Sequence, residues 1–340
     1  MQQTKKLFLR TDQLTIGYDK QALPLHENIN VSVKPGQFTC LLGPNGAGKS
    51  TLIKTLCGFI KPMSGQVWYG NEKIERIPEA QRAKKISVVL TDRLDVQNLS
   101  VFELVALGRT PYTGFFGKLL PRDIQLVYHA IEEVGLKGYT QKSIDKMSDG
   151  ERQKAMIAKA LVQETPFIIL DEPAAFLDLP AKIEIMQLLR RLSKEKNRGI
   201  LLSTHDLEMA LQTADKIWLM AQGKTLQEGI PEDLVLNNQF KHFFEREGIQ
   251  FDNYTGTFKY HKQIQHKINL KGEGNACNWV ARALHRIGFA TVDEGSKYTV
   301  QIYHNVPSQF ALYHSNKLVL RCNTIEELME GVVRAVAAKP

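Results

Sequence analysis

The sequence predicts an α/β protein followed by a small α+β domain, and three observations support this. A glycine-rich phosphate-binding loop at 43–51 stands between an apolar run and a helical pattern. Two further apolar runs end in acidic or histidine residues, as parallel strands do where they carry a site. Beyond about residue 250, short alternating runs and amphipathic patterns indicate a separately packed unit. A chain of 340 residues is long enough for about two domains.

The loop reads GPNGAGKST and fills every restricted position of the pattern G-x-x-x-x-G-K-[ST]. Residues 38–42 before it are expected to form a buried strand, and residues 51–56 after it a helix. The glycines let backbone N–H groups approach a phosphate, and the helix start adds partial positive charge. Lys49 is expected to reach the terminal phosphates, and Ser50 to ligate Mg²⁺. The residues predicted to contact nucleotide here are Gly43, Pro44, Asn45, Gly46, Ala47, Gly48, Lys49, Ser50 and Thr51.

Two later apolar runs end in residues suited to phosphate chemistry. The run 166–170 leads to Asp171 and Glu172, and the carboxyl end of a parallel strand would bring both beside the phosphate loop. Asp171 is predicted to bind Mg²⁺, and Glu172 to polarise the water that attacks the γ-phosphate. The run 199–204 leads to His205, which is predicted to contact that phosphate or to orient the water.

Two weaker signals accompany these runs. Tyr18 closes a segment, 14–18, that alternates like an edge strand, and its ring is predicted to stack on adenine, although a core or surface tyrosine fits the position nearly as well. Ser148 and Glu151 form a capping box before the helix expected at 152–162. The capping box is fully explained if these residues simply begin a helix. The functional hypothesis is that the same N-terminus holds a γ-phosphate.

Charge and composition limit the class of protein. The formal charge is +8, and residues 255–340 hold 11 Lys or Arg against 6 Asp or Glu, without a dense basic run, which favours a solvated face over a nucleic-acid surface. No window approaches the ~20 apolar residues of a membrane span, and residues 1–10 lack a signal-peptide core, so we expect a cytoplasmic protein that meets the membrane through a partner. Reduced thiols are expected for Cys40, Cys57, Cys277 and Cys322.

In this order the motifs resemble those of the ATP-binding cassette (ABC) family over about residues 6–240. GPNGAGKST is similar to its Walker A, ILDEP to its Walker B and MSDGE to its signature. Tyr18, 176–178 and 203–206 stand at its adenine-stacking, D-loop and switch-histidine positions. The stretch 99–112 further resembles the subgroup that serves iron–siderophore, haem and cobalamin importers.

The resemblance implies a P-loop NTPase of ABC type, with a mixed sheet core, a helical subdomain at about 94–162 and a cassette over 6–250. It implies ATP and Mg²⁺ as cofactors. It also implies a homodimer in which the signature of one chain closes over the phosphate loop of the other. Transmembrane permease subunits would be the partners, at the inner face of the cell membrane, and no nucleic acid is expected. Further nucleotide contacts would then come from Ser148, Gly150, Glu151 and Asp178.

The sequence departs from the family pattern at two positions. Thr91 stands where the family has a glutamine that helps to hold the metal, and the shorter threonine side chain reaches less far. Asp92 is an alternative ligand, through water. Asp149 replaces a glycine of the signature, and we expect its carboxylate to face away from phosphate.

The segment 255–340 is expected to be an accessory α+β domain. Strands are predicted at 263–271, 298–302 and 317–321, and an amphipathic helix at 325–336. Five histidines here are too dispersed to indicate a metal site. A structural or dimer-stabilising role and a regulatory ligand-binding role both remain open. The apolar face of a second helix is assigned to Trp279, Val280, Ala283, Leu284 and Ile287.

Three functions fit these patterns. The leading hypothesis is the ATP-hydrolysing subunit of an importer for an iron chelate, haem or cobalamin. A soluble ABC ATPase that acts on ribosomes or DNA is an alternative, although the chain has one cassette and no heptad run. A nucleotide-dependent regulator with weak turnover is the other, and Thr91 slightly favours it.

Overall fold

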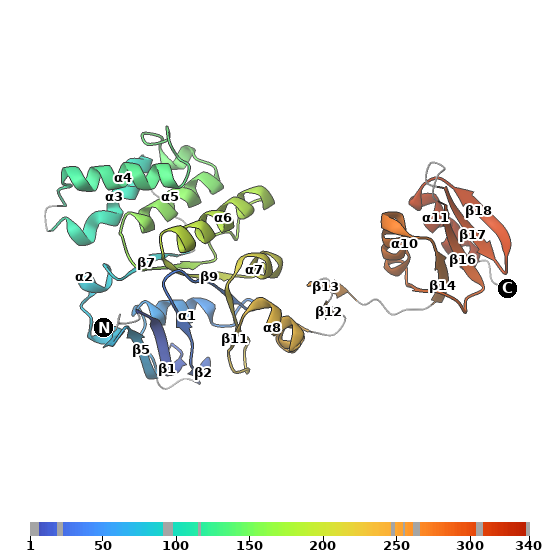
Figure 1. Ribbon diagram of the computed structural model, residues 1–340, viewed down its shortest axis with the longest axis horizontal. Coiled ribbons are helices and arrows are strands. Elements are labelled where there is room, and N and C mark those ends of the chain that lie inside the picture. The colour runs from blue at the N-terminus through green and yellow to red at the C-terminus, as the bar shows by residue number, and fades with distance from the viewer. Residues whose placement is uncertain are drawn as a thin grey trace, which may run out of the picture. The chain divides into compact units, whose positions relative to one another are not determined.

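The chain divides into two units in its computed structural model (Figure 1). The larger unit comprises Met1–Glu245 and Phe251–Thr257, and the smaller one Arg246–Gln250 and Phe258–Pro340. Each unit is described by itself below. The structure describes residues 7–18, 23–90, 98–114, 117–245, 249–253, 256–260, 266–303 and 309–337.

A mixed six-stranded sheet forms the centre of the larger unit, in the order β11-β10-β4-β9-β8-β7. The pairs from β10 to β7 are all parallel, and only β11 is antiparallel to its neighbour. The two apolar runs that come after the phosphate loop in sequence form β8 and β9, which are neighbours in this sheet. Every residue of β4 and β8 is buried, as expected for strands covered on both faces. The strands are β4 (Phe38–Leu42), β7 (Ile86–Val89), β8 (Phe167–Asp171), β9 (Gly199–Thr204), β10 (Lys216–Leu219) and β11 (Gln227–Gly229).

A second, antiparallel sheet packs on one side of this core, with α1 (Lys49–Leu56) between the two sheets (Figure 1). Leu52 and Ile53 of α1 are fully buried there, beside Leu41 of β4. This layer therefore fixes the helix that begins at the phosphate loop. Its strands are β1 (Leu9–Ile16), β2 (His26–Ile29), β3 (Ser32–Val33), β5 (Ser64–Tyr69) and β6 (Glu72–Lys73), and the short helix α2 (Glu79–Arg82) follows them.

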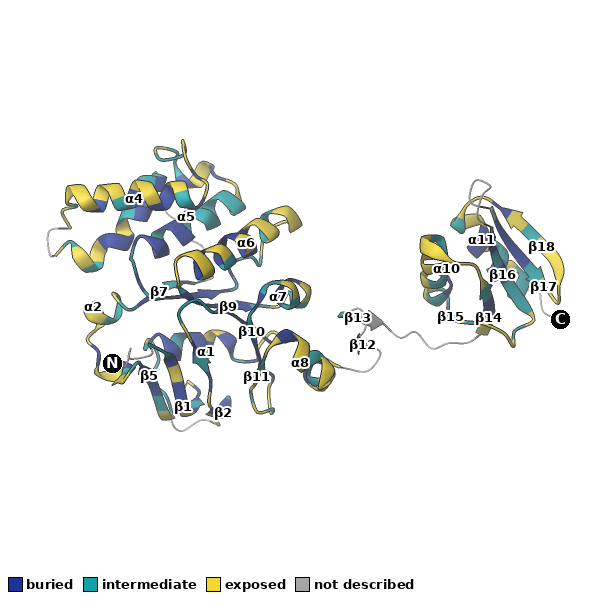
Figure 2. Ribbon diagram, viewed as in Figure 1, coloured by how far each residue is buried: buried dark blue, intermediate teal, exposed yellow. Residues whose placement is uncertain are grey.

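Helices cover the opposite face of the central sheet (Figure 2). The expected helical subdomain is present as α3 (Val101–Ala106), α4 (Pro121–Glu133) and α5 (Asp149–Leu161). Buried Arg109 ties it together, because its guanidinium donates to Asp123 and to Glu164, each at 2.9 Å. The unit continues through α6 (Leu179–Glu195), α7 (Leu207–Thr213), α8 (Pro231–Leu236) and α9 (Gln239–Phe244), and the two-stranded pair β12 (Ile249–Asp252) and β13 (Thr257–Tyr260) follows.

The smaller unit has a five-stranded sheet in the order β15-β14-β16-β17-β18 with two helices. Both helices contribute to one apolar cluster, including Leu284 of α10 and Leu328 of α11, so they cover the same face of the sheet. The expected α+β character is confirmed. The elements are β14 (His266–Lys271), α10 (Gly274–Arg286), β15 (Phe289–Val292), β16 (Tyr298–Tyr303), β17 (Gln309–His314), β18 (Lys317–Cys322) and α11 (Ile325–Ala337).

Two local expectations were wrong. The alternating segment before Tyr18 belongs to β1, which has β2 on one side and β5 on the other and is therefore not an edge strand. Trp279 does not lie on the buried face of α10, because 60% of its side chain is exposed. Only one side of the apolar stripe, with Val280 and Leu284, reaches the sheet, and the guanidinium of Arg282 lies over the Trp279 ring.

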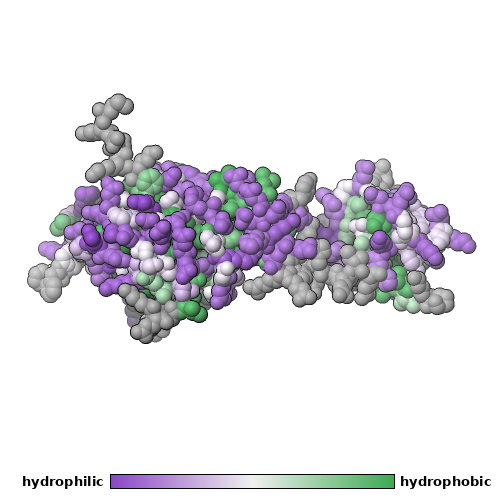
Figure 3. Space-filling model, turned by 90° about the horizontal axis from the view of Figure 1, so that it is seen from below, coloured by the Kyte–Doolittle hydropathy of each residue, from purple (hydrophilic) through white to green (hydrophobic). Residues whose placement is uncertain are grey.

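Among the described residues, no helix is both long and apolar enough to span a membrane. The face drawn in Figure 3 is mostly hydrophilic, and its hydrophobic residues form separate patches. The four cysteines are free thiols, as expected. Burial raises the pKa of the Cys40 and Cys57 thiols, so both stay protonated.

Candidate active site

The glycine loop connects the end of β4 to the start of α1, in the strand–loop–helix order that the motif requires. A Cβ atom at Gly43 would lie 2.2 Å from the carbonyl oxygen of Met220, so only glycine fits. Gly48 has φ = 95°, which also favours glycine. Nε2 of buried His26 donates to the carbonyl oxygen of Ala47 at 2.8 Å and ties the loop to the second sheet. Sequence reasoning did not identify His26.

The Lys49 ammonium lies inside the curve of this loop. It donates to the carbonyl oxygens of Gly43 at 2.9 Å and Pro44 at 3.3 Å, and it lies 3.3 Å from Oε1 of Glu172. Only 6% of the lysine side chain is exposed. The structure thus brings together the cation of the loop and the carboxylate at the end of β8, which are 123 positions apart in sequence (172 minus 49).

The Ser203 hydroxyl contacts both acidic residues at the end of β8, Asp171 and Glu172. Asp171 and Ser203 are register partners in the parallel pair β8–β9. The Ser203 hydroxyl donates to Oδ1 of Asp171 at 2.5 Å and accepts the backbone N–H of Glu172 at 2.9 Å. Glu172 has a left-handed backbone, φ = 47°, which costs a non-glycine residue of order 1 kcal/mol. This hydroxyl therefore stabilises the backbone geometry of Glu172.

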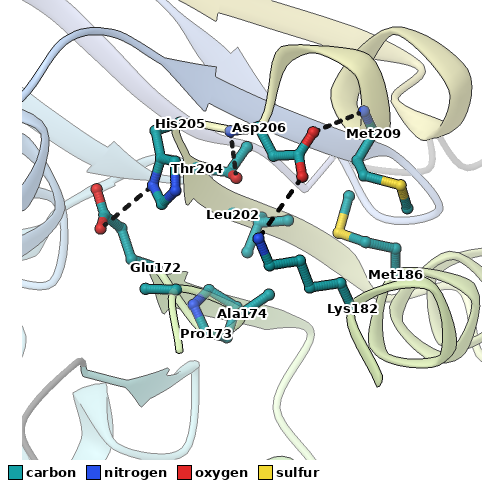
Figure 4. A pocket seen from close by; sticks show the side chains of 11 residues that line it. Glu172, Pro173, Ala174, Lys182, Met186, Leu202, Thr204, His205, Asp206 and Met209 are labelled. Carbon is teal, nitrogen blue, oxygen red and sulfur yellow. Dashed lines mark hydrogen bonds and ion pairs between the residues drawn. The ribbon is translucent and has the colours of Figure 1, made fainter. Parts of the chain in front are cut away.

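His205 and Glu172 lie next to each other in the lining of a pocket that is formed by the ends of β8 and β9 and by α6 and α7 (Figure 4). Nδ1 of His205 lies 3.7 Å from Oε2 of Glu172, and half of the imidazole side chain is exposed. The neighbouring Asp206 caps α7 by accepting the N–H of Met209 at 3.1 Å. Lys182 of α6 approaches the same carboxylate at 4.0 Å. The Asp206 cap therefore fixes the turn that carries the imidazole of His205.

Tyr18 and Ser50 lie near the start of α1. The Thr51 hydroxyl donates to the Tyr18 hydroxyl at 2.9 Å, while 77% of the tyrosine side chain is exposed. Tyr18 is thus attached to the loop and keeps its ring in solvent, where a planar group can stack on it. The Ser50 side chain is exposed at the helix start.

The capping box before α5 is present as expected. Ser148 accepts the N–H of Glu151 at 3.2 Å, and Glu151 accepts the N–H of Ser148 at 3.0 Å. This second bond, aided by Lys142, lowers the pKa of Glu151. Asp149 pairs with Arg152 at 3.4 Å. Within the described part of the chain, the Ser148 side chain hydrogen-bonds only to Glu151, and no hydrogen bond or ion pair joins the signature to the glycine loop.

The remaining expected site residues have separate positions. Asp178 caps α6 by accepting the N–H of Ala181 at 3.0 Å. Gly150 packs tightly against α6, since a Cβ atom there would lie 3.2 Å from Cβ of Ala181. Thr91 and Asp92 lie outside the described residues. Sequence reasoning named Ser203 only as part of a motif, and its register opposite Asp171 was the signal that could have identified its contacts.

Comparison with known proteins agrees with this arrangement. A family model described as "ABC transporter" matches residues 26–175. A second model, described as "Iron ABC transporter C-terminal domain", matches residues 265–333, a segment in which the sequence motifs had indicated no family.

Individual relatives extend the match over most of the larger unit. An ABC transporter ATP-binding protein of Methanocaldococcus jannaschii is 40% identical over 251 residues, which is 74% of this chain and 86% of the relative. The iron(3+)-hydroxamate import ATP-binding protein FhuC of Bacillus subtilis is 35% identical over 237 residues, covering 70% and 87%. A solved structure from Clostridium perfringens, cbiO1 of the cbiONQ transporter complex, has a TM-score of 0.62 at 29% identity, covering 70% and 94%.

The glycine loop, the carboxylates at the end of β8 and the relatives that share most of the cassette lead to one conclusion: this chain belongs to the ATP-binding proteins of ABC transporters, and it is an ATPase.

Proposed function

We propose that this chain powers an importer of an iron chelate by binding and hydrolysing ATP at the site around Lys49 and Glu172. The convergence of this cation and this carboxylate at the end of the central sheet is the observation that carries the proposal. The printed functions of relatives such as the iron(3+)-hydroxamate import protein, and the match to an iron transporter C-terminal domain, support iron chelates over haem or cobalamin.

In this proposal the backbone of residues 43–51 surrounds the phosphates of ATP, and Tyr18 stacks on adenine. The phosphates compete with the carbonyl oxygens of Gly43 and Pro44 for the Lys49 ammonium. Positioning and charge neutralisation supply most of the catalysis of phosphoryl transfer, so a fixed cation at this place is the main requirement.

The oxygen donors near the loop fit Mg²⁺, which prefers hydroxyl and carboxylate ligands. Ser50 is exposed at the loop, and Asp171 is held in place by Ser203. Thr91 is proposed as a third ligand. Bound Mg²⁺ would neutralise charge on the phosphates. Glu172 polarises the attacking water, and His205, which faces the same carboxylate, orients the γ-phosphate or that water.

We further propose that two chains close head-to-tail around two ATP molecules. The Ser148 side chain bonds within its own helix and not to its own glycine loop, so a second copy is the natural source of Ser148, Gly150 and Glu151 at the phosphates. Asp178 lies at the start of α6 and would join that interface. Closure on binding ATP and opening after hydrolysis would drive separate permease subunits at the inner face of the membrane. The cassette is proposed to span 6–250 and the accessory domain 255–340.

The test is complementation in cells that lack this chain. We expect wild-type protein to restore uptake of a radiolabelled iron–hydroxamate chelate, and Glu172→Gln to fail while still binding ATP. Labelled haem and cobalamin are the comparison cargoes, and uptake of only one of these would overturn the iron assignment. A protein that sediments with ribosomes and never with membranes would instead support the soluble ABC ATPase.

A further inference from the structure

The C-terminal sheet has a second face, which neither α10 nor α11 covers. Alternate residues of a strand point to opposite faces, and the helices pack on Val300 and Leu312. The strand register places the intervening residues in one row across the other face: Lys271 pairs with Gln301, Gln301 with Ala311, and Ala311 with Arg321. We call the face that carries this row the open face.

The open face carries cations and no carboxylates. The strands β14 to β18 contain no Asp or Glu. Lys267, Lys271 and Arg321 are all exposed there, and none has a carboxylate partner among the residues that the structure describes. Of the six acidic residues in 258–340, Glu326, Glu327 and Glu330 lie on α11, on the other side of the sheet, and Glu273, Asp293 and Glu294 lie outside the strands. Among the described residues, the charges on the open face therefore form no ion pair that holds the unit together.

A pair of tyrosines stands in the middle of this face. Tyr303 of β16 and Tyr313 of β17 lie on either side of the Gln301–Ala311 pair, and their hydroxyl oxygens meet at 2.7 Å. Ala311 has no exposed surface, which agrees with larger side chains closing over it. One phenol donates its proton to the other, so the accepting phenol still has a proton to donate outward.

Arg321 completes this group from the edge strand. Its guanidinium lies over the Tyr303 ring, 5.7 Å from the ring centre, which restricts an otherwise flexible side chain. The hydrogen bond with Tyr313 raises the pKa of Tyr303, so the phenol is neutral and remains a donor at neutral pH. The open face thus presents phenol and guanidinium donors close together.

We propose that the open face binds a small organic polyanion, whose carboxylate or phenolate oxygens are held by Arg321, Lys271 and the Tyr303–Tyr313 pair. Lys271 and Arg321 stand three strand spacings apart, roughly 14 Å between backbones, and both long side chains can reach toward the centre. A ligand with several oxyanion groups fits this spacing better than a single phosphate does. The residues of this site are different from those of the ATP site, and the proposal does not depend on which chelate is transported.

The chemistry of the face favours such a ligand over single-stranded nucleic acid. Proteins bind unpaired bases on free aromatic faces. Here the guanidinium of Arg321 occupies one face of the Tyr303 ring, and the hydroxyls of Tyr303 and Tyr313 are hydrogen-bonded to each other. The groups that remain accessible are donors to oxygen: the guanidinium, the ammonium of Lys271, the amide of Gln301 and the phenol proton that the tyrosine pair does not use internally.

Isothermal titration calorimetry on the full chain tests the proposal, with citrate and its ferric complex as probes. Saturable binding is expected, weakened about tenfold or more by Arg321→Ala and by Lys271→Ala, since each removes a charge-assisted contact. Tyr303→Phe should cause a smaller loss. Arg282→Ala is the matched control: it removes the same charge from α10, on the helix side, and should leave binding unchanged.

Thermal unfolding of each variant shows whether the C-terminal unit still folds. If Arg321→Ala does not fold, Lys271→Ala still tests the proposal. The proposal is wrong if neither probe binds saturably at millimolar concentration, or if folded Arg321→Ala and Lys271→Ala bind like wild type. Binding of single-stranded RNA or of anionic lipid vesicles through Arg321, with no binding of citrate, would also overturn it.

Discussion

The two units differ in how they use charged side chains. In the cassette, Lys49 faces Glu172 and buried Arg109 faces Asp123, so the central cations are matched with anions and enclosed. In the C-terminal unit, Lys271 and Arg321 are exposed on a strand face and lack carboxylate partners among the described residues. Enclosed pairs hold a geometry, whereas exposed and unpaired charges are available to something outside the chain. The contrast implies that charge removal damages the cassette and leaves the stability of the smaller unit intact.

The largest effect is expected at the catalytic carboxylate. Glu172→Gln keeps the size and the left-handed backbone, but it removes the base, so ATP hydrolysis should fall by about 10²–10⁴-fold while ATP binding persists. Steady-state ATPase assays and nucleotide binding measure the two quantities. The control Glu195→Gln changes an exposed carboxylate at the end of α6 and should have no effect. Undiminished turnover in the Glu172 variant would remove this residue from catalysis.

The buried pair of the helical subdomain should give the largest effect on stability. Asp123→Ala leaves Arg109 without a main partner and should lower the free energy of unfolding by about 3 kcal/mol at neutral pH. The pKa of Asp123 is lowered, first by the Leu120 N–H and also by Arg109. Its stabilisation is therefore complete above the ordinary carboxyl pKa, and it is lost as the pH falls through the lowered value. Urea unfolding at pH 7 and below pH 4 should show the difference between wild type and variant shrinking.

A more selective effect is expected at Ser203. Ser203→Ala removes the hydroxyl between Asp171 and the Glu172 N–H, and a lost hydrogen bond to a charged group is worth about 1.5–3 kcal/mol, or roughly tenfold or more in rate. We expect kcat to fall while KM for ATP changes little. Ser203→Thr retains the hydroxyl and should recover most of the rate. A rise in KM together with the fall in kcat, or no recovery with threonine, would indicate a merely structural role.

The smallest effect is expected in the C-terminal unit. Arg321→Ala removes an exposed charge without a carboxylate partner, so the free energy of unfolding should change by no more than about 0.5 kcal/mol. The same denaturation experiment that reports a large loss for Asp123→Ala measures it. A loss of several kcal/mol would show that removing a charge destabilises the C-terminal unit as much as it does the cassette.

Much of the cassette could be predicted because its motifs are local. The strand 38–42, the loop and the capping box at Ser148 follow from neighbouring residues alone, and each is present. Contacts that depend on strand register were not accessible in the same way. Ser203 meets Asp171 only because β8 and β9 are neighbours, and His26 of the second sheet contacts Ala47 of the glycine loop. Hydrophobic spacing placed Trp279 on a buried face, but tertiary packing used only one side of that stripe.

The left-handed backbone at Glu172 has a consequence for how this protein can vary. The position accepts glycine, asparagine or aspartate at little conformational cost, but a β-branched residue there would strain the chain before any question of chemistry arose. Substitutions that add no backbone strain here are therefore few, and Glu172→Gln is among them because glutamine branches no closer to the backbone than glutamate does. The backbone geometry at this single site therefore restricts which side chains it can carry, in addition to the chemistry of hydrolysis.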